Sequence, residues 1–202
     1  KLSPDIETLA EALKTAGYTT GGFTGDAGVS GRFGYKDGFD VYTDEETFGG
    51  FDNSEKHALT WLDSLKPGEK FFMFFHGYDL HGQFKIADNY KSRYAPQDYK
   101  GPYKGTQKEE EKLREDQLAK PLTFTDADRE FWTAWYDGKI RDADDRLAGF
   151  IAELEKRDLF KKTVIIVLSD HGEEFFDHGG FDHGHTLYDE QLRVPLIFVV
   201  PG

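Results

Sequence analysis

The stretch Val164-Ile165-Ile166-Val167-Leu168-Ser169-Asp170-His171-Gly172-Glu173 decides the fold class of this chain. Its first five residues are all apolar, a run of strand length that predicts a buried strand over Thr163–Ser169. The strand runs directly into a carboxylate, an imidazole and a glycine that lets the chain turn sharply. In open α/β sheets, ligands bind beyond the carboxyl ends of the strands. The stretch therefore predicts a sheet strand with a polar site at its end.

Strands and helices alternate along the rest of the chain. Further apolar runs predict strands at Tyr18–Thr24, Phe71–His76 and Leu196–Val200. Because such alternation is typical of a parallel sheet covered on both faces, we expect an α/β fold, a three-layer αβα sandwich with a mostly parallel sheet. Apolar residues at helical spacing predict three helices. The first has Ser3 as its N-cap and ends at Gly17, the second covers Ser54–Leu65, and the third is long and is capped by Thr125.

The composition excludes several classes of protein. The 202 residues hold 25 Lys and Arg against 38 Asp and Glu, a formal net charge of −13, which disfavours general nucleic-acid binding and adsorption to anionic membranes. With 38 % hydrophobic and 15 % aromatic residues, the chain is too apolar to be disordered. No apolar run reaches the roughly 18–20 residues of a membrane span. Since there is no cysteine, disulfides, thiolate zinc sites and cysteine nucleophiles are excluded within this sequence.

Histidines gather after two of the predicted strands. Asp170 and His171 are adjacent at a strand end, where they can share one divalent cation such as zinc, manganese or iron. A zinc site needs three or four protein ligands, so two ligands do not define one. A capping aspartate beside an exposed loop histidine is an equally good interpretation of the pair alone. The histidines His76 and His81 follow the predicted strand that begins at Phe71. Four more histidines follow the predicted strand at Val164–Leu168, namely His171, His178, His183 and His185.

The sequence around this pair carries a recognisable pattern. It closely resembles the signature of the sulfatases of the alkaline-phosphatase-like superfamily. Weaker matches upstream fall in the same order as in that family, at Asp5–Phe23, at His76–Gly82 and at Tyr136–Asp145. The resemblance covers nearly the whole chain except about residues 84–125. The pattern reads Ser169-Asp170-His171-Gly172-Glu173-Glu174-Phe175, then His183-Gly184-His185-Thr186-Leu187-Tyr188, then Arg193-Val194-Pro195-Leu196-Ile197.

The resemblance assigns roles to individual residues. Asp170 and His171 match the pair that binds the family's divalent metal ion, which here would be calcium, zinc or manganese. Because calcium prefers oxygen ligands, the imidazole of His171 slightly favours zinc or manganese. His183 and His81 match residues that contact the sulfate or phosphate group, and His185 is a further candidate catalytic residue beside them. A metal ion and such donors would stabilise charge on the leaving oxygen, whereas a protonated histidine could act as general acid; the sequence leaves both roles open. Three other residues are expected to stay outside the chemistry, namely His76, Arg193 and His178.

The family's nucleophile and its paired-acid motif are not found among these residues. The nucleophile is a formylglycine made from Cys or Ser, or a Ser or Thr in phosphate-processing relatives, and no C/S-x-P-x-R motif occurs here. We therefore expect residues 1–202 to be a partial catalytic domain with an incomplete alkaline-phosphatase-like fold, and any formylglycine to lie outside them. We expect this piece alone neither to bind metal tightly nor to hydrolyse an ester. The resemblance to this family favours a periplasmic or otherwise exported protein. The sequence predicts no oligomeric state.

Residues 84–125 differ from the rest in character. They are polar, rich in Tyr and Lys, and are interpreted as an insertion with a solvated helix at Glu109–Gln117. Lys91 and Arg93 stand in a locally basic part of this insertion, shortly after His81. They are candidates for a rim that selects an anionic or sugar substrate, with a plain solvated loop as the alternative.

The sequence thus favours part of a metal-dependent hydrolase of sulfate monoesters, acting on a small-molecule or glycan anionic ester. Inside the superfamily, the alternative is a phosphate or phosphonate ester hydrolase or a phosphoethanolamine transferase. A non-catalytic binding relative is a third hypothesis, which the presence of Asp170, His171 and His183 disfavours. The residues that precede Lys1 in the full-length protein would discriminate among the three.

Overall fold

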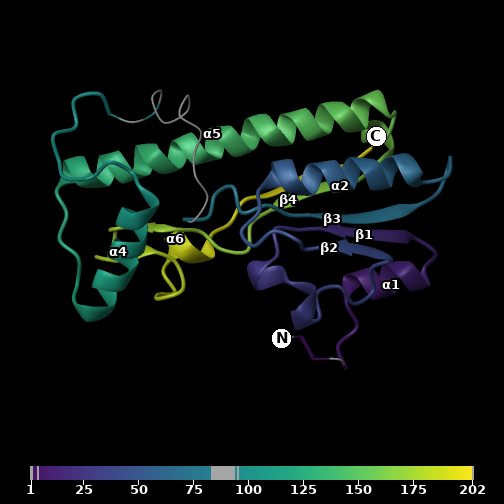
Figure 1. The fold of residues 1–202 in the computed structure, drawn as a ribbon, viewed down its shortest axis with the longest axis horizontal. Helices are drawn as coiled ribbons and strands as arrows, with labels where there is room; N and C mark the ends of the chain where they lie inside the picture. The colour runs from purple at the N-terminus through teal and green to yellow at the C-terminus, as the bar shows by residue number, and fades with distance from the viewer. Residues whose placement is uncertain (1, 4, 83–93, 95, 202) are drawn as a thin grey trace. The chain divides into compact units, whose positions relative to one another are not determined.

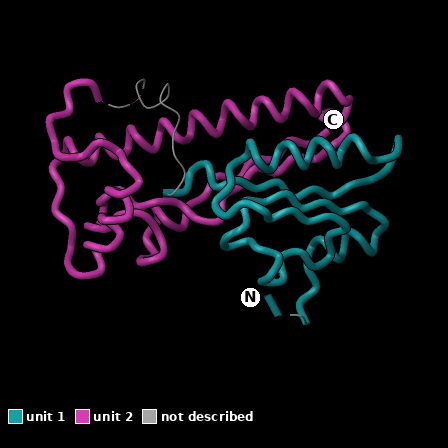
Figure 2. The backbone as a smooth tube through the Cα atoms, viewed as in Figure 1, with its two compact units in different colours: residues 1–84 teal, residues 85–202 magenta. Residues whose placement is uncertain are grey.

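The computed structural model describes residues 2–3, 5–82, 94 and 96–201 (Figure 1). The chain divides into two compact units, residues 1–84 and residues 85–202, called here the N-terminal and the C-terminal unit (Figure 2). Within the described residues, no helix is both long enough and apolar enough to cross a membrane.

The N-terminal unit is built on a parallel sheet of three strands. Strand β1 (Thr19–Phe23) lies in the centre, between β2 (Val41–Thr43) and β3 (Phe71–Phe75). Helices α1 (Leu9–Thr15) and α2 (Phe51–Ser64) lie on opposite faces of this sheet (Figure 1). The expected parallel sheet with a helix layer on each face is confirmed. The loop after β1 holds two short 3-10 turns, at Ala27–Val29 and Gly31–Phe33.

Close packing of α2 on β1 explains a glycine in the central strand. The Trp61 ring of α2 contacts the Phe23 ring at a centroid distance of 5.5 Å. Gly21 lies on the same face of β1, where an added Cβ would come within 2.9 Å of the Trp61 ring. Since ring atoms cannot approach a side-chain carbon so closely without a shift, glycine is what lets the helix reach the sheet.

Helix α1 begins later than the sequence indicated. Its N-cap is Thr8, whose Oγ1 accepts the Glu11 N–H at 3.2 Å while the Glu11 carboxylate accepts the Thr8 N–H at 2.7 Å. The prediction of Ser3 as N-cap is wrong because Ser3 accepts the backbone N–H groups of Asp5 and Ile6, which closes only a turn. The expected glycine stop is confirmed, since Gly17 has φ +85°.

The C-terminal unit contains two larger helices and short strands. Helices α4 (Gln107–Ala119) and α5 (Asp126–Lys156) each begin with a capping box, set by Thr106 and Thr125. The remaining elements follow in the order 3-10 turn Phe160–Lys162, β4 (Ile165–Leu168), β5 (Glu174–Phe175), β6 (Phe181–Asp182), α6 (Asp189–Leu192) and β7 (Leu196–Val199). Strand β4 pairs antiparallel with β7, and β5 pairs antiparallel with β6.

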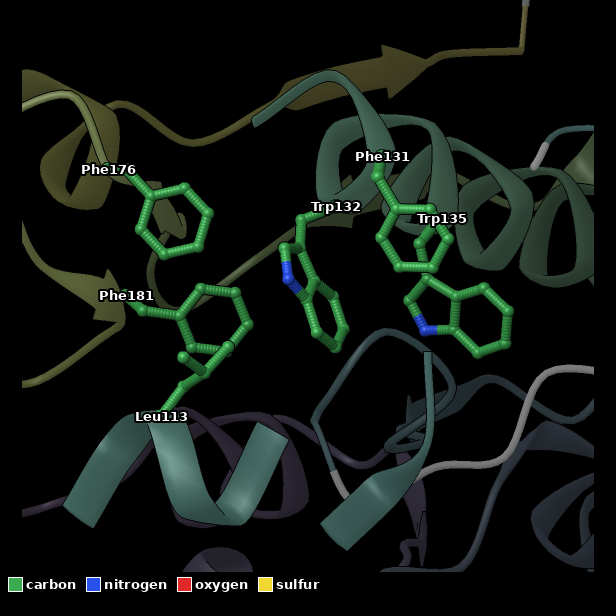
Figure 3. Close-up of a cluster of buried hydrophobic side chains, with 6 residues drawn as sticks. All are labelled: Leu113, Phe131, Trp132, Trp135, Phe176 and Phe181. Carbon is green, nitrogen blue, oxygen red and sulfur yellow. The ribbon is translucent and has the colours of Figure 1, made fainter. Parts of the chain in front are cut away.

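An aromatic cluster forms the core of the C-terminal unit (Figure 3). Trp132 of α5 lies between Phe131 and Phe181, at ring-centroid distances of 5.5 and 5.2 Å. Tyr99 and Tyr103, from the stretch interpreted as a polar insertion, pack against this cluster; the Tyr99 ring stacks on Phe131 at 4.4 Å. Tyr99 and Tyr103 are therefore half-buried against this core, whereas most other residues of 96–104 are exposed. The choice between a substrate rim and a solvated loop stays a prediction, because Lys91 and Arg93 lie outside the described residues.

The strand that decides the fold class is less buried than expected. Ile166 and Leu168 of β4 keep 49 % and 62 % of their surface exposed, and all four residues of β7 are exposed. The prediction of a fully buried strand at Thr163–Ser169 is therefore wrong for the described residues. Among these residues, β4 pairs only with β7, in a sheet of two strands. A sheet of this size leaves apolar side chains in contact with water on its faces.

Candidate active site

The turn that follows β4 is fixed by the side chains of Ser169 and Asp170 and by a backbone bond to Gln191. The Ser169 hydroxyl donates to the His171 carbonyl at 2.6 Å, and Asp170 Oδ1 accepts the His171 N–H at 3.1 Å. The Gly172 N–H donates to the Gln191 carbonyl at 2.9 Å. A Cβ at Gly172 would collide with the Glu190 carbonyl oxygen, so the glycine allows the end of α6 to close on this turn.

Asp170 and His171 lie close together directly after β4. The Asp170 Oδ1 atom lies 3.6 Å from the His171 Nε2 atom. The His171 Nδ1 atom lies 3.0 Å from the Gly172 carbonyl oxygen, which can only accept, so Nδ1 carries the proton and Nε2 presents its lone pair. That is the tautomer a metal ligand needs. A carboxylate and an imidazole together suit zinc or manganese better than calcium, and the residues present fit a divalent ion.

His183 lies beside this pair and is held by two carboxylates. Its Nδ1 atom is 2.6 Å from Asp182 Oδ1 and 3.0 Å from Glu173 Oε1. Its ring stacks on the His171 ring at a centroid distance of 3.8 Å. Strands β5 and β6 produce this proximity, because their pairing places Glu173 and His183 at neighbouring ends of one hairpin.

The carboxylates determine the charge of His183. Burial opposes the protonated imidazole, but Asp182 and Glu173 outweigh it and raise the pKa of His183 to about 10. Burial also raises the pKa of Glu173, whereas hydrogen bonding to His183 overcomes burial and lowers the pKa of Asp182. Asp182 is therefore the firmer counter-charge. At neutral pH, this geometry makes His183 a cationic hydrogen-bond donor.

His185 is held by a different carboxylate. The Glu174 side chain is fully buried, and its Oε2 lies 3.0 Å from His185 Nε2. Its Oε1 accepts the backbone N–H groups of His178 and Gly180 at 3.0 and 2.7 Å. Gln191 of α6 adds to this network, since its side-chain oxygen accepts the Gly184 N–H at 3.1 Å. Glu174 and Gln191 thus fix the loop that carries both His183 and His185.

His178 was expected to be a simple surface residue, and the structure gives it partners. Its Nδ1 lies 2.6 Å from Glu190 Oε1, and its half-exposed ring stacks on Tyr188 at 3.5 Å. Ligand atoms of Glu174, His178 and Glu190 lie within 4.8 Å of one another. Both oxygens of Glu174 already accept hydrogen bonds from the loop, so this group is explained by loop structure without an ion.

A second grouping of ligand atoms identifies a residue that sequence reasoning missed. Atoms of His171, Glu173 and His183 also lie within 4.8 Å of one another among the described residues. Glu173 therefore belongs to the site, although the sequence pattern assigned it no role. The available signal was its position, since an acid three residues after Asp170 remains at the same strand end.

Two histidines of the N-terminal unit, His76 and His81, follow strand β3, whereas His57 lies in helix α2. The His76 N–H donates to the Phe23 carbonyl at 2.9 Å and the His76 carbonyl accepts from Ser54 Oγ at 2.8 Å. The role expected for the His76 side chain stays a prediction. The His81 ring packs against Phe48 and Tyr78, each at a centroid distance of 5.3 Å.

Asp79, which lies between His76 and His81, has a structural role. The Asp79 carboxylate is 2 % exposed and accepts the Phe51 N–H at 2.8 Å, at the first turn of α2. A carboxylate there satisfies a helix N–H and faces the positive end of the helix dipole.

The predicted site residues are thus brought together in part. Asp170, His171 and His183 form one cluster in the C-terminal unit, with His185 two residues beyond His183 on the loop after β6. His81 belongs to the N-terminal unit, so its role as an anion contact stays a prediction. Lys91 and Arg93 lie outside the described residues, and the rim assigned to them also stays a prediction.

Comparisons with known proteins bear on the whole chain. The family model for Sulfatase matches residues 1–202. Mouse arylsulfatase K is 34 % identical over 79 residues, which cover 39 % of this chain and 14 % of that protein. A protein solved in complex with its substrate D-glucosamine-2-N,6-O-disulfate has 17 % identity and a TM-score of 0.69, over 98 % of this chain and 56 % of that one.

A second solved structure is similar to the same degree. The phosphonate monoester hydrolase of Agrobacterium radiobacter has 19 % identity and a TM-score of 0.70, over 99 % of this chain and 54 % of that one. The chain thus spans about half the length of these two solved proteins. At such identities the likeness shows a shared fold, and the match of the family model over residues 1–202 shows that the chain belongs to the sulfatase family.

Proposed function

We propose that the full-length protein hydrolyses sulfate monoesters with the help of a bound divalent metal ion, and that the loops after β4 and β6 supply one side of its active site. The observation that carries this proposal is the stacking of His183 on His171 at 3.8 Å, beside Asp170. The stacking places a cationic donor next to a pair of residues suited to a metal ion, and both would face the same anionic group.

Each residue has a distinct task in this proposal. Asp170 and His171 would hold the ion, which when bound would supply electrostatic stabilisation of charge on the ester oxygens. His183, kept cationic by two carboxylates, would donate a hydrogen bond to a nonbridging oxygen of the sulfate group. His185, oriented by Glu174, would give a proton to the departing alcohol oxygen.

Other contacts to the substrate are proposed from the family resemblance. His81 would be a second donor to the sulfate group, and Lys91 and Arg93 would select an anionic or sugar substrate. The family's nucleophile has no counterpart among residues 1–202, so we propose that these residues expressed alone are inactive. The substrate would be a small-molecule or glycan sulfate ester.

The test uses the full-length protein with 4-nitrophenyl sulfate. We expect chelation of divalent metal to abolish turnover, and Asp170→Asn and His171→Gln each to lower kcat/KM at least about 100-fold. The control Asp177→Asn removes a half-exposed carboxylate that pairs with Arg129, and it should leave turnover within twofold of the wild type. Turnover that survives both chelation and the two substitutions would contradict the proposal.

A phosphate or phosphonate ester is the second candidate. Its support is the fold shared with a phosphonate monoester hydrolase, together with a site whose donors would contact the oxygens of either tetrahedral anion. The ratio of kcat/KM for 4-nitrophenyl sulfate to that for 4-nitrophenyl phenylphosphonate decides between them, and a ratio below one favours the second candidate. Absence of turnover with both esters, while metal still binds, would favour the non-catalytic relative.

A further inference from the structure

We infer that Arg114, on helix α4, is a positioning residue for His183 and acts through Asp182. The inference deepens the proposed function and rests on it, because it takes His183 as the residue that contacts the ester. It also gives a role in the site to a helix that was expected to be a solvated part of an insertion.

The first observation is the division of the Asp182 carboxylate between two side-chain partners, Arg114 and His183. The Arg114 Nε atom lies 2.9 Å from Asp182 Oδ2. The other oxygen, Oδ1, lies 2.6 Å from His183 Nδ1 and accepts the His183 backbone N–H at 2.7 Å. Because one oxygen is held by the guanidinium and the other by the histidine, rotation of the carboxylate would break one of the two contacts.

The second observation is the burial of this carboxylate. The Asp182 side chain is 4 % exposed, whereas that of Arg114 is 33 % exposed. A buried carboxylate that loses a charged partner is strongly destabilised in its ionised, oriented form. Without Arg114, Asp182 would turn toward water or weaken its hold on Nδ1, and the His183 ring would lose its fixed direction.

The third observation is the backbone of Asp182. Its φ is +74°, a left-handed conformation that costs a non-glycine residue on the order of 1 kcal/mol. The conformation directs the chain so that Asp182 reaches Arg114 while His183 reaches His171. Strained residues of this kind persist where the surroundings over-determine them, and Arg114 is one of the contacts that do so.

One face of α4 carries all of these contacts. Glu110, Arg114 and Gln117 recur at helical spacing, and Gln117 accepts the Phe181 N–H at 2.8 Å next to Asp182. Glu110 forms an ion pair with Lys139 of α5 at 3.0 Å, and Leu113 belongs to the aromatic core cluster. Helix α4 thus contacts both α5 and β6, and these contacts give Arg114 a fixed base.

The test compares three variants of the full-length protein. Arg114→Met removes the guanidinium and keeps most of the apolar stem, and Arg114→Lys keeps the charge. Arg129→Met is the matched control, because Arg129 binds Asp177 and the Phe176 carbonyl of the same hairpin without touching Asp182. We expect Arg114→Met to lower kcat at least about 10-fold with KM within twofold, Arg114→Lys to recover part of the loss, and the control to stay within twofold.

A second readout is independent of turnover. The ring signals of His183 in the protein labelled with 13C-histidine, assigned with His183→Gln, should shift in Arg114→Met and stay in place in Arg129→Met. Added guanidinium ion should restore both the signal and part of kcat in Arg114→Met. A loss of kcat without a shift of the His183 signal, a shift without a loss of kcat, or neither change would overturn the inference.

The two proposals fail in different ways. If the wild type turns over neither sulfate nor phosphonate esters, the proposed function is wrong, and the His183 signal alone then decides whether Arg114 positions that ring. If the wild type is active and Arg114→Met behaves like the control in both readouts, the proposed function stands and the role of Arg114 is refuted.

Discussion

The histidines of the C-terminal cluster take their orientation from different oxygen acceptors. The Gly172 carbonyl accepts from His171, Asp182 and Glu173 hold His183, and Glu174 holds His185. Because the acceptor selects which ring nitrogen carries a proton, these oxygens decide which histidine can bind a metal ion and which can donate. The difference between the imidazoles thus comes from their partners.

Glu174 is the side chain whose replacement should disturb the hairpin most. Its Oε1 accepts two backbone N–H groups and its Oε2 accepts from His185 and Gln191. In Glu174→Gln, either orientation of the amide places an NH₂ group against donors. We expect a loss of about 2–3 kcal/mol in the free energy of unfolding, measured in urea.

A control separates this effect from the loss of negative charge. Glu111→Gln changes an exposed carboxylate of α4 that accepts only a local bond from Gln107, and it should change the free energy of unfolding by less than about 0.5 kcal/mol. Equal stability of Glu174→Gln and Glu111→Gln would show that Glu174 does not hold the loop.

The buried ion pair between Glu110 and Lys139 should make stability depend on pH. Burial raises the pKa of Glu110 to about 7, against the opposing effect of Lys139. Between the ordinary value of 4.5 and about 7, the native state therefore binds a proton that the unfolded state has released. The contribution of this group to the free energy of unfolding is thus largest below that window and falls as the pH rises through it.

The measurement compares urea unfolding of the wild type and of Glu110→Gln/Lys139→Met at several pH values from 4.5 to 7.5. Relative to this variant, the wild type should lose on the order of 2–3 kcal/mol as the pH rises. The double variant Glu111→Gln/Lys112→Met, at exposed neighbours, should run parallel to the wild type. A constant difference between wild type and the buried-pair variant would refute the assignment.

At the scale of elements, helix α5 depends on the cap at its N-terminus. Thr125 Oγ1 accepts the Asp128 N–H at 3.2 Å and donates to the Asp128 carboxylate at 2.7 Å. Asp128 also accepts from Tyr99 at 2.5 Å, so the cap joins the helix to the aromatic core. Thr125→Ala should therefore lower the free energy of unfolding by about 1–2 kcal/mol.

Thr133 provides the matched control, because it is an exposed threonine in the interior of the same helix. Thr133→Ala should leave stability unchanged or raise it by a few tenths of a kcal/mol, since alanine is the better helix former. The comparison is made in parallel thermal melts. If both variants melt at the same temperature, the capping box contributes nothing.

Elements with local signals were predictable from the sequence. Strands β1 and β3, helix α5 and its Thr125 cap follow from apolar spacing and capping chemistry, which depend on residues a few positions apart. The start of α1 was predicted wrongly because both Ser3 and the Thr8-x-x-Glu11 pattern are valid start signals, and tertiary packing uses the second.

The site was predictable only where it is continuous in sequence. Asp170 and His171 follow a strand directly, whereas the partners of His183 come from β6, from the turn before β5 and, through Asp182, from α4. Tyr99 and Tyr103 likewise reach the core through contacts with residues about 30 positions away, which spacing within a polar stretch cannot reveal. Long-range pairing of short segments is thus the part that the sequence leaves undetermined.

At the scale of the whole molecule, the exposed face of the β4–β7 sheet is the feature with a consequence for solution behaviour. Ile166 is the cross-strand partner of Phe198 and Leu168 that of Leu196, so all four side chains share one face. Each keeps between 49 % and 62 % of its surface exposed. Contiguous apolar faces of this kind associate with other apolar surfaces in water.

Residues 1–202 expressed alone should therefore self-associate. We expect sedimentation to show oligomers whose proportion rises with concentration, and a dye such as ANS to fluoresce on binding. Ile166→Thr/Phe198→Thr should reduce both effects, because threonine keeps β-propensity and removes much of the apolar area. A control at an exposed helical site, Leu118→Thr, should reduce neither. Monomeric, dye-free behaviour of the unaltered chain would refute this expectation.

The left-handed backbone at Asp182 also limits which sequences this site can explore. Glycine and asparagine tolerate that backbone readily, so both could replace aspartate without harm to the chain path. Neither carries the negative charge that Arg114 and His183 share. A library of variants at position 182 that is selected only for soluble expression should thus retain aspartate, asparagine and glycine. The same library selected for turnover should retain aspartate alone. Folding and catalysis would then place different requirements on this one residue.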